Sequence, residues 1–233
     1  MGARVLLNVD LGELPDEPEA LYGLAHVANV ACGGHAGDEA SMGRAVELCT
    51  RHGTLLGAHP SYPDREGFGR RPVTMTTDAI WATVMDQCAR LAALARAKGR
   101  HVAFMKPHGA LYHAAQKDAA AAEALVEATL RALGPGVTVI GPPVGALVEA
   151  TARATLRFAR EGFADRATHE NGSLVARGEP GALVVDPVAA AARATALVRE
   201  GHIETLCVHG DTPGAVAVAR AVRRALDAYA AGA

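Results

Sequence analysis

The fold of this chain is constrained most by a regular alternation of short apolar segments with longer segments of helical periodicity. Seven short segments are rich in the apolar and β-branched residues of buried strands, at residues 4–9, 27–32, 54–58, 101–105, 137–141, 156–161 and 205–210. A segment of helical character follows each of them, at residues 18–27, 39–52, 76–99, 118–134, 144–152, 186–201 and 213–231. This alternation favours a parallel sheet, because each helix returns the chain to the same strand direction.

The number of units favours one parallel architecture over another. Seven units in 233 residues, with no linker or charge block between them, predict a single-domain irregular (β/α)7 TIM-like barrel over residues 1–233. A doubly wound sheet is the alternative. Asp38 and either Thr76 or Thr77 are candidate N-caps. Four glycines stand where a helix would end in a left-handed residue: Gly53, Gly99, Gly134 and Gly201.

Charge and composition exclude several classes of partner. The formal net charge is -2 and the sequence pI is about 6.5, so neither nucleic acid nor an anionic membrane is attracted broadly. No run of about 18 apolar residues is present, and acidic residues follow the N-terminus too closely for a secretory signal. We expect a cytoplasmic protein. The four cysteines form no CxxC pair, which predicts reduced, buried thiols: Cys32, Cys49, Cys88 and Cys207.

Ionisable side chains gather at the predicted carboxyl ends of six of the seven strands, the edge at which parallel α/β folds place their active sites. Because buried charge is costly, this convergence indicates function more strongly than any one residue does. In chain order the residues are Asn8, Asp10 and Glu13; His35 and Asp38; His59, Tyr62 and Asp64; Lys106, His108 and Tyr112; Glu161, Asp165 and Arg166; His209 and Asp211.

Other polar residues have weaker signals. The long loop at residues 60–72 is of a length that is usually functional or mobile, and its Arg70 and Arg71 could hold a carboxylate or phosphate or could simply be solvated. Asp165 and Arg166 are adjacent and could pair with each other. The remaining histidines are expected on the solvated surface: His26, His52, His101, His113, His169 and His202.

The sequence has no GxxxxGK[ST], GxGxxG, HExxH or GxSxG motif, but six ordered segments identify a resemblance. NVDLGE, NVACGGHAGD, GAHPSYPDREGFGRR, KPHGALY, EGFADR and CVHGDTP resemble the LamB/YcsF family, which supplies one component of the bacterial ATP-dependent 5-oxoprolinase, its A subunit. The resemblance implies a barrel similar to the carbohydrate deacetylases. It also implies cleavage of 5-oxo-L-proline to L-glutamate with hydrolysis of ATP, a co-substrate, to ADP and phosphate, in a complex with the B and C subunits. The family pattern has an aromatic residue at Gly34, so the glycine predicts a roomier pocket beside His35.

Opening a lactam near neutral pH requires activation, and this requirement suggests roles for the residues at the strand ends. Lys106 is the candidate for stabilising phosphate or an oxyanion. Asp10 and Glu13 are candidate bases, with His35, His59 and His108 as proton carriers. Pro107 and Gly109 would fix the backbone so that Lys106 and His108 serve one edge. The expected substrate-binding residues are Asn8, Arg70, Tyr112, Glu161, Asp165, Arg166, His209 and Asp211.

Two other functions compete with this hypothesis. Asp10, His59 and His108 form a plausible one-carboxylate, two-histidine metal set, which would suit a metal-dependent amide or carbohydrate deacetylase-type hydrolase. The third possibility is a barrel that binds a ligand without catalysis. The sequence leaves open whether a divalent metal is needed.

Overall fold

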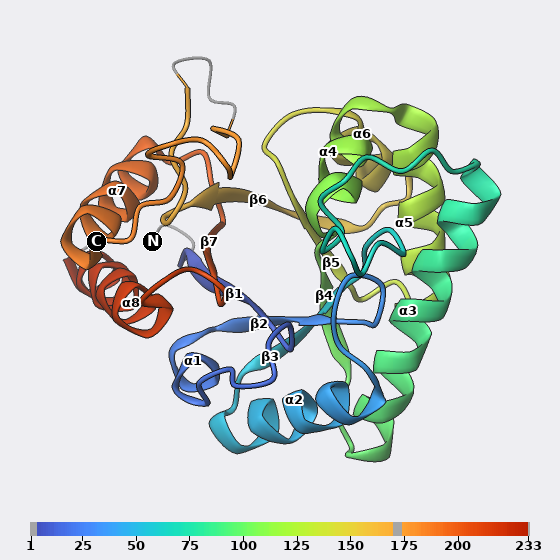
Figure 1. The fold of residues 1–233 in the computed structure, drawn as a ribbon, viewed down its shortest axis with the longest axis horizontal. Helices are drawn as coiled ribbons and strands as arrows, with labels where there is room; N and C mark the ends of the chain where they lie inside the picture. Colours follow the sequence, from blue (N-terminus) through green and yellow to red (C-terminus); the bar gives the residue numbers. More distant parts are fainter. Residues whose placement is uncertain (1–3, 170–173, 233) are drawn as a thin grey trace.

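The computed structural model describes residues 4–169 and 174–232, whose strands form a closed, seven-stranded parallel barrel (Figure 1). Each strand pairs with the next, and β1 pairs with both β2 and β7. The predicted (β/α)7 barrel is therefore confirmed, and the doubly wound alternative is wrong. The strands are β1 (Leu6–Leu11), β2 (Val27–Ala31), β3 (Leu55–His59), β4 (Val102–Met105), β5 (Thr138–Gly141), β6 (Arg157–Phe163) and β7 (Thr205–His209).

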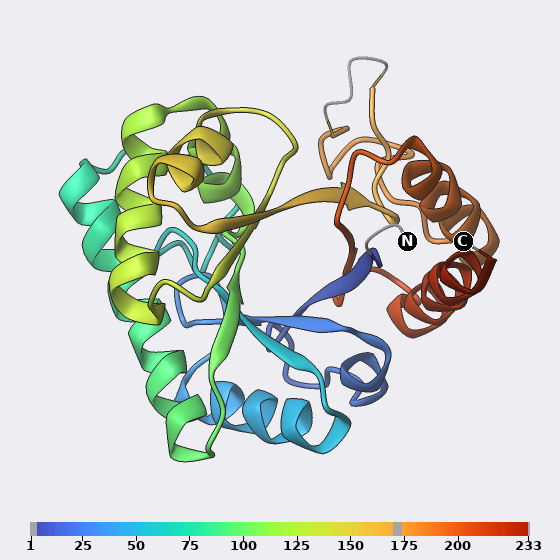
Figure 2. The same ribbon diagram turned by 180° about the vertical axis from the view of Figure 1, so that it is seen from behind.

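Helices cover the outside of the barrel, with α3 to α6 on one side, α7 and α8 on the other, and α1 and α2 along the side between them (Figures 1 and 2). The helices are α1 (Ala20–Leu24), α2 (Glu39–His52), α3 (Thr77–Ala97), α4 (Gly109–Lys117), α5 (Ala119–Leu133), α6 (Ala146–Arg153), α7 (Pro187–Glu200) and α8 (Ala215–Gly232). The connection after β4 holds two helices where the sequence predicted one over residues 118–134. Asp118 separates them, because its carboxylate accepts hydrogen bonds from the backbone N–H groups that begin α5.

The predicted helix caps are present with one exception. Asp38 forms a capping box with Ser41, and the Thr76 hydroxyl accepts a hydrogen bond from the backbone N–H of Ala79. Gly53 and Gly201 end their helices in the left-handed conformation. The prediction for Gly134 is wrong in part, since its φ is 85° but its ψ is 175°. Gly99 has a φ of +67°.

Most outward-facing side chains of the barrel strands are buried and apolar, and the inner face changes character along the strands. Successive residues of a strand point to opposite sides, so Leu6, Asn8 and Asp10 share the inner face of β1. At the amino end of the strands, Leu6 packs with Phe104 against a small buried cluster of Val27, Ile140 and Ala159. Towards the carboxyl end, most inner positions are polar, among them Asp10, Asn29 and Glu161. Apolar groups therefore fill the barrel at the amino end of the strands, and hydrogen-bonding groups fill it at the carboxyl end.

Two further observations concern the state of the cysteines and the character of the helices. All four cysteines are free and buried, as the spacing predicted. Within residues 4–169 and 174–232, no helix has the length and apolarity that a membrane span requires.

Candidate active site

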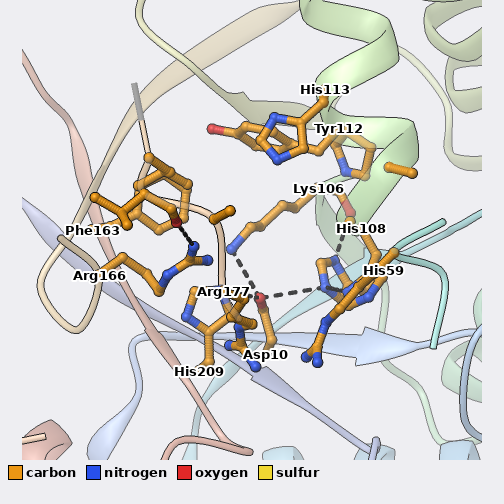
Figure 3. A pocket seen from close by; sticks show the side chains of 17 residues that line it. Asp10, His59, Lys106, His108, Tyr112, His113, Phe163, Arg166, Arg177 and His209 are labelled. Atoms are coloured by element: carbon orange, nitrogen blue, oxygen red, sulfur yellow. Dashed lines mark hydrogen bonds and ion pairs between the residues drawn. The ribbon is translucent and has the colours of Figure 1, made fainter. Parts of the chain in front are cut away.

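Side chains from four strands meet in a cavity of about 210 Å³ at the carboxyl end of the barrel. Asp10 comes from β1, His59 from β3, His209 from β7, and Lys106 follows the last residue of β4 (Figure 3). Nε2 of His59 lies 3.4 Å from Oδ2 of Asp10, and Nε2 of His209 lies 3.8 Å from the same oxygen. The parallel sheet thus brings these four predicted residues together, because all strands deliver their carboxyl ends to one edge.

The Lys106 ammonium is buried among acceptors from three strands. Its Nζ lies 3.0 Å from Oδ1 of Asp10 and 2.8 Å from Oε1 of Glu161, and the Cys207 Sγ is 3.0 Å away. Burial alone would lower the pKa of Lys106, but Asp10, Cys207 and Glu161 raise it well above its ordinary value. Burial would likewise raise the pKa of Asp10, but His59 and Lys106 hold it well below its usual range. Both shifts favour the ionised form of the pair.

A set of amide and hydroxyl groups fixes these charges from inside the barrel. The Asn29 side-chain amide donates to Oδ1 of Asn8 at 2.7 Å and to Oδ1 of Asp10 at 2.8 Å. The Asn8 amide in turn donates to Oε1 of Glu161 at 3.0 Å and to the Thr205 hydroxyl at 2.9 Å. Asn8 thus supports the site from below the cavity, although it was predicted to bind substrate. Sequence reasoning missed Asn29, Thr205 and Cys207, which the alternation along each strand could have identified.

Three histidines and a glutamate form a second group beside Asp10. The His35 and His108 rings stack in parallel with centroids 3.6 Å apart, and Nε2 of His35 lies 2.9 Å from Oε1 of Glu13. Nδ1 of His108 lies 3.0 Å from Nε2 of His59. Burial lowers the pKa of both His35 and His108, whereas for His59 the nearby Asp10 outweighs burial and raises it.

The loop at residues 60–72 packs over this histidine group. The backbone carbonyl of Phe68 accepts a hydrogen bond of 2.9 Å from Nε2 of His108. Gly69 has a φ of +65°, and a Cβ there would lie 2.8 Å from Cβ of His35, so only glycine fits. Gly109 was expected to let the chain turn into the next helix, and it has a φ of +54° directly after His108, the N-cap of α4.

His209 is oriented by Asp165. The Asp165 carboxylate accepts hydrogen bonds from the backbone N–H of His209 at 2.8 Å and from the Thr212 hydroxyl at 2.7 Å, and it lies 3.0 Å from Nδ1 of His209. The predicted pairing of Asp165 with Arg166 is wrong, because the Asp165 oxygens face His209 while the Arg166 guanidinium donates to the carbonyl of Val175. Asp165 therefore positions a cavity-facing imidazole and does not line the cavity itself.

Three arginines line the cavity: Arg70, Arg166 and Arg177. Asp211 pairs with both Arg70 and Arg177, so it holds guanidinium groups in place and does not face the cavity directly. Arg71 is directed elsewhere, in an ion pair with Asp64. Sequence reasoning missed Arg177, which lies in an irregular segment between β6 and α7 and carries no local motif.

Aromatic and apolar groups complete the lining, including Tyr112 and Phe163 (Figure 3). Two of the histidines assigned to the surface need comment. His113 is exposed, as predicted, and also lines the cavity. His26 is placed differently, since it is half-buried and accepts a hydrogen bond of 2.8 Å from the backbone N–H of Leu7. The expectation of extra room at Gly34 is also wrong, because Ser61 and Gln87 occupy the space that a Cβ would enter.

The proposed metal set of Asp10, His59 and His108 needs correction. Asp10 is engaged by the Lys106 ammonium, whereas His59 and His108 share a compact group of donor atoms with Glu13 and His35. His59 and His108 are thus still candidate ligands, but Glu13 and His35 take the place of Asp10 beside them. The arrangement as a whole combines an ammonium, a carboxylate, imidazoles and guanidinium groups around one small cavity, which suits a small, polar, anionic ligand.

Comparisons with known proteins agree with the geometry. A model of the LamB/YcsF family matches residues 5–232. A protein of Methylococcus capsulatus that is named as the A subunit of 5-oxoprolinase is 44% identical, over 98% of this chain and 94% of its own length. The lactam utilization protein of Thermus thermophilus superposes with a TM-score of 0.89 at 36% identity, covering 97% of each chain.

A more distant structure, the family 4 carbohydrate esterase of Streptomyces lividans, has a TM-score of 0.50 at 13% identity over 98% of this chain and 89% of its own. At that identity the likeness shows a common fold alone. The match to the family model over nearly the whole chain, together with the relatives above, leads to one conclusion: the chain belongs to the LamB/YcsF family.

Proposed function

We propose that this chain is the A subunit of an ATP-dependent 5-oxoprolinase, acting as a single barrel domain that cleaves 5-oxo-L-proline to L-glutamate. The reaction would be coupled to hydrolysis of ATP to ADP and phosphate. The observation that carries the proposal is a single cavity lined by Lys106, Asp10 and three arginines. The relatives of this chain are named as the A subunit of 5-oxoprolinase.

The size and charge of the cavity support a small anionic ring as substrate. A volume of about 210 Å³ lies below the range of roughly 300–1,000 Å³ typical of drug-sized ligands. Arg166 and Arg177 offer guanidinium groups that bind carboxylates in a forked geometry. We therefore assign the substrate carboxylate to these arginines, with the lactam ring directed towards Lys106.

The chemistry requires an activated carbonyl, because an amide resists attack by water near neutral pH. In the proposed route the lactam oxygen attacks the γ-phosphorus of ATP and ADP leaves. Water then adds to the ring carbon, and the carbon–nitrogen bond breaks as the nitrogen takes up a proton, giving an acyl phosphate. A second water releases phosphate and leaves L-glutamate, so one ATP and two waters are consumed.

Each step has a candidate residue in the cavity. The Lys106 ammonium faces the negative charge that develops on oxygen, in a site where most water is excluded. Asp10 is the candidate base for the attacking water. His209, fixed by Asp165, is the candidate donor of a proton to the ring nitrogen. Glu161 keeps the ammonium in place from the other side.

Partners follow from the names of the relatives, each of which is described as one lettered component of a larger enzyme. We propose that the B and C subunits complete the enzyme and that ATP is held with their help, since the sequence of this chain has no phosphate-loop motif. Dependence on ATP would place the complex in the cytoplasm.

The test is reconstitution. The full chain is co-expressed with candidate B and C subunits, and L-glutamate formed from 5-oxo-L-proline is measured with and without ATP. The proposal expects ATP-dependent glutamate release by the complex and co-purification of the three chains. A complex that assembles but releases no glutamate with ATP contradicts the proposal.

A metal-dependent hydrolase of the deacetylase type is the second candidate, and one observation favours it: the compact group of Glu13, His35, His59 and His108. The same assay separates the two functions. Amide or acetyl hydrolysis by the chain alone, without ATP, would favour the second candidate over the first.

A further inference from the structure

Four donor atoms in the buried histidine group have the spacing of a metal coordination sphere. Glu13, His35, His59 and His108 each offer one ligand atom, and these four atoms all lie within 4.8 Å of one another. The glutamate oxygen is 2.9, 3.4 and 3.7 Å from the nitrogens of His35, His108 and His59. Ligands bound tetrahedrally at the usual Zn–N and Zn–O lengths are roughly 3.4 Å apart, and these distances are close to that value. Because the His35 and His108 rings are stacked in parallel, at least one of them must turn out of the stack for both to bind one ion in the plane of the ring.

Hydrogen bonds on the far side of two rings aim bare nitrogens at this point. Nδ1 of His59 lies 2.8 Å from the carbonyl oxygen of Lys106, and Nε2 of His108 lies 2.9 Å from that of Phe68. A carbonyl oxygen only accepts, so both of these nitrogens carry the proton. The two nitrogens that face each other at 3.0 Å then have lone pairs between them, or share one further proton. A metal ion can take the place of that proton, and an N–H···O=C bond behind the ring is the usual support of a metal-bound histidine.

Charge also favours a cation here. Asp10, Glu13 and Glu161 are buried carboxylates, and the ammonium of Lys106 lies between Asp10 and Glu161. Glu13 instead faces three imidazoles. Because a buried carboxylate needs a compensating charge, a divalent ion beside Glu13 would balance this part of the site.

A second group of possible ligands, Asp10, Cys207 and His209, does not compete. The ammonium of Lys106 lies 3.0 Å from both the Asp10 carboxylate and the Cys207 sulfur, so a cation is already built into that position.

We propose that Glu13, His35, His59 and His108 bind a divalent transition-metal ion. Imidazole and carboxylate donors suit Zn²⁺, Co²⁺, Ni²⁺, Fe²⁺ or Mn²⁺ better than Ca²⁺ or Mg²⁺. His59 and His108 line the cavity while Glu13 and His35 lie behind them, so the ion belongs to the cavity floor next to Asp10. Such an ion supplies Lewis acidity, and its use in lactam opening rests on the proposed function, whereas its binding does not. With the ion bound, the three histidines are ligands, and the role of proton carrier belongs to His209.

The experiment measures the metal directly. The full-length chain, freed of any affinity tag and purified without chelator, is analysed by plasma mass spectrometry, then stripped and titrated with Co²⁺ while the visible d–d absorption is followed. About one ion per chain and an intense tetrahedral or five-coordinate Co²⁺ spectrum are expected. X-ray absorption of the Co²⁺ protein is expected to give imidazole nitrogen as the main ligand.

Variants locate the site. His35→Ala and His108→Ala are expected to weaken Co²⁺ binding by more than about 100-fold, beyond what outer-sphere changes cause. His113→Ala is the matched control, since this histidine lines the same cavity but is outside the group, and it is expected to bind as the parent does. If circular dichroism shows that an alanine variant is unfolded, Glu13→Gln replaces it, because this substitution keeps the side-chain shape and is also expected to weaken Co²⁺ binding.

Two results would overturn the site: a folded parent chain that retains no Zn²⁺, Co²⁺ or Mn²⁺ after equilibration, or loss of binding in His113→Ala equal to that in His35→Ala. A chain that binds the metal in a complex without lactam turnover would contradict the proposed function and leave the metal site standing.

Discussion

Nζ of Lys106 lies 3.0 Å from Oδ1 of Asp10, and both side chains are buried on the inner face of a parallel barrel. Residues 96 positions apart in the sequence thus form one ion pair at the floor of the cavity. Burying such a pair is favourable only when further hydrogen bonds complete it, and here Asn29 and Glu161 do so. The pair therefore links the stability of the barrel to the chemistry of the site.

The first prediction concerns this pair. Lys106→Met is expected to abolish ATP-dependent lactam turnover in the reconstituted complex. It is also expected to reduce the free energy of unfolding by roughly 3–5 kcal/mol, because the two carboxylates are left without a counter-ion. Turnover and urea unfolding are the measurements. Lys98→Met is the control, since that lysine pairs with Glu47 on the exposed surface and should stay near the parent in both. Undiminished turnover in Lys106→Met would remove this residue from the mechanism.

The second prediction tests recognition of the substrate carboxylate. Arg177→Met is expected to raise KM for 5-oxo-L-proline by about 10–100-fold with a smaller change in kcat, since a hydrogen bond between charged groups contributes roughly 1.5–3 kcal/mol. Steady-state kinetics of the complex give both constants. Arg153→Met, at an exposed ion pair with Glu123, should leave them unchanged. A fall in kcat at constant KM would argue that Arg177 does not bind the ground-state substrate.

The third prediction concerns proton transfer. His209→Gln is expected to lower kcat by about 10²–10⁴-fold, the usual contribution of a positioned acid or base. Asp165→Asn should act through the same imidazole, and its signature is a shifted pH profile of kcat, which a purely structural defect would not produce. His101→Gln, at an exposed histidine, is the control. Activity near the parent value in His209→Gln would assign the proton to another group.

The fourth prediction is a pH dependence of stability. Burial alone would raise the pKa of Asp211, but Arg177 and Arg70 lower it from 3.8 to about 2. A carboxyl with a lowered pKa in the folded state stabilises the protein above pH 4 and loses that contribution as the pH falls towards 2. We expect Asp211→Asn to reduce the free energy of unfolding by about 2 kcal/mol at pH 7 and pH 5. In urea unfolding, the difference from the parent should shrink below pH 4; a difference that is constant with pH would contradict the assignment.

The fifth prediction concerns the cysteines. All four are buried, and burial raises the pKa of the Cys32 and Cys49 thiols to about 12. Since the thiolate is the reactive form, none should react with a disulfide reagent in the native protein, and four should react after unfolding in guanidinium chloride. Rapid modification of one thiol in the native chain would show that the barrel opens at that position.

Much of the architecture could be predicted from the sequence because it depends on local patterns. The alternation of apolar strands with helices requires a parallel sheet, and Asp10, His59 and His209 stand where such strands end. Parallel strands deliver those ends to one edge, so the gathering of the residues follows from the order of elements alone. Asn29 and Cys207 could have been found in the same way, from the period of two along β2 and β7.

Tertiary structure alone decided how these residues meet. The pairing of Lys106 with Glu161, the stacking of His35 on His108, and the place of Arg177 in the wall all depend on closure of the barrel and on strand register. Closure brings side chains from opposite strands within hydrogen-bonding distance, and no local sequence pattern encodes distances across the barrel. The sequence by itself thus determined the fold and the edge that carries the site. The three-dimensional packing determined which charges pair, which arginines face the cavity and which histidines face one another.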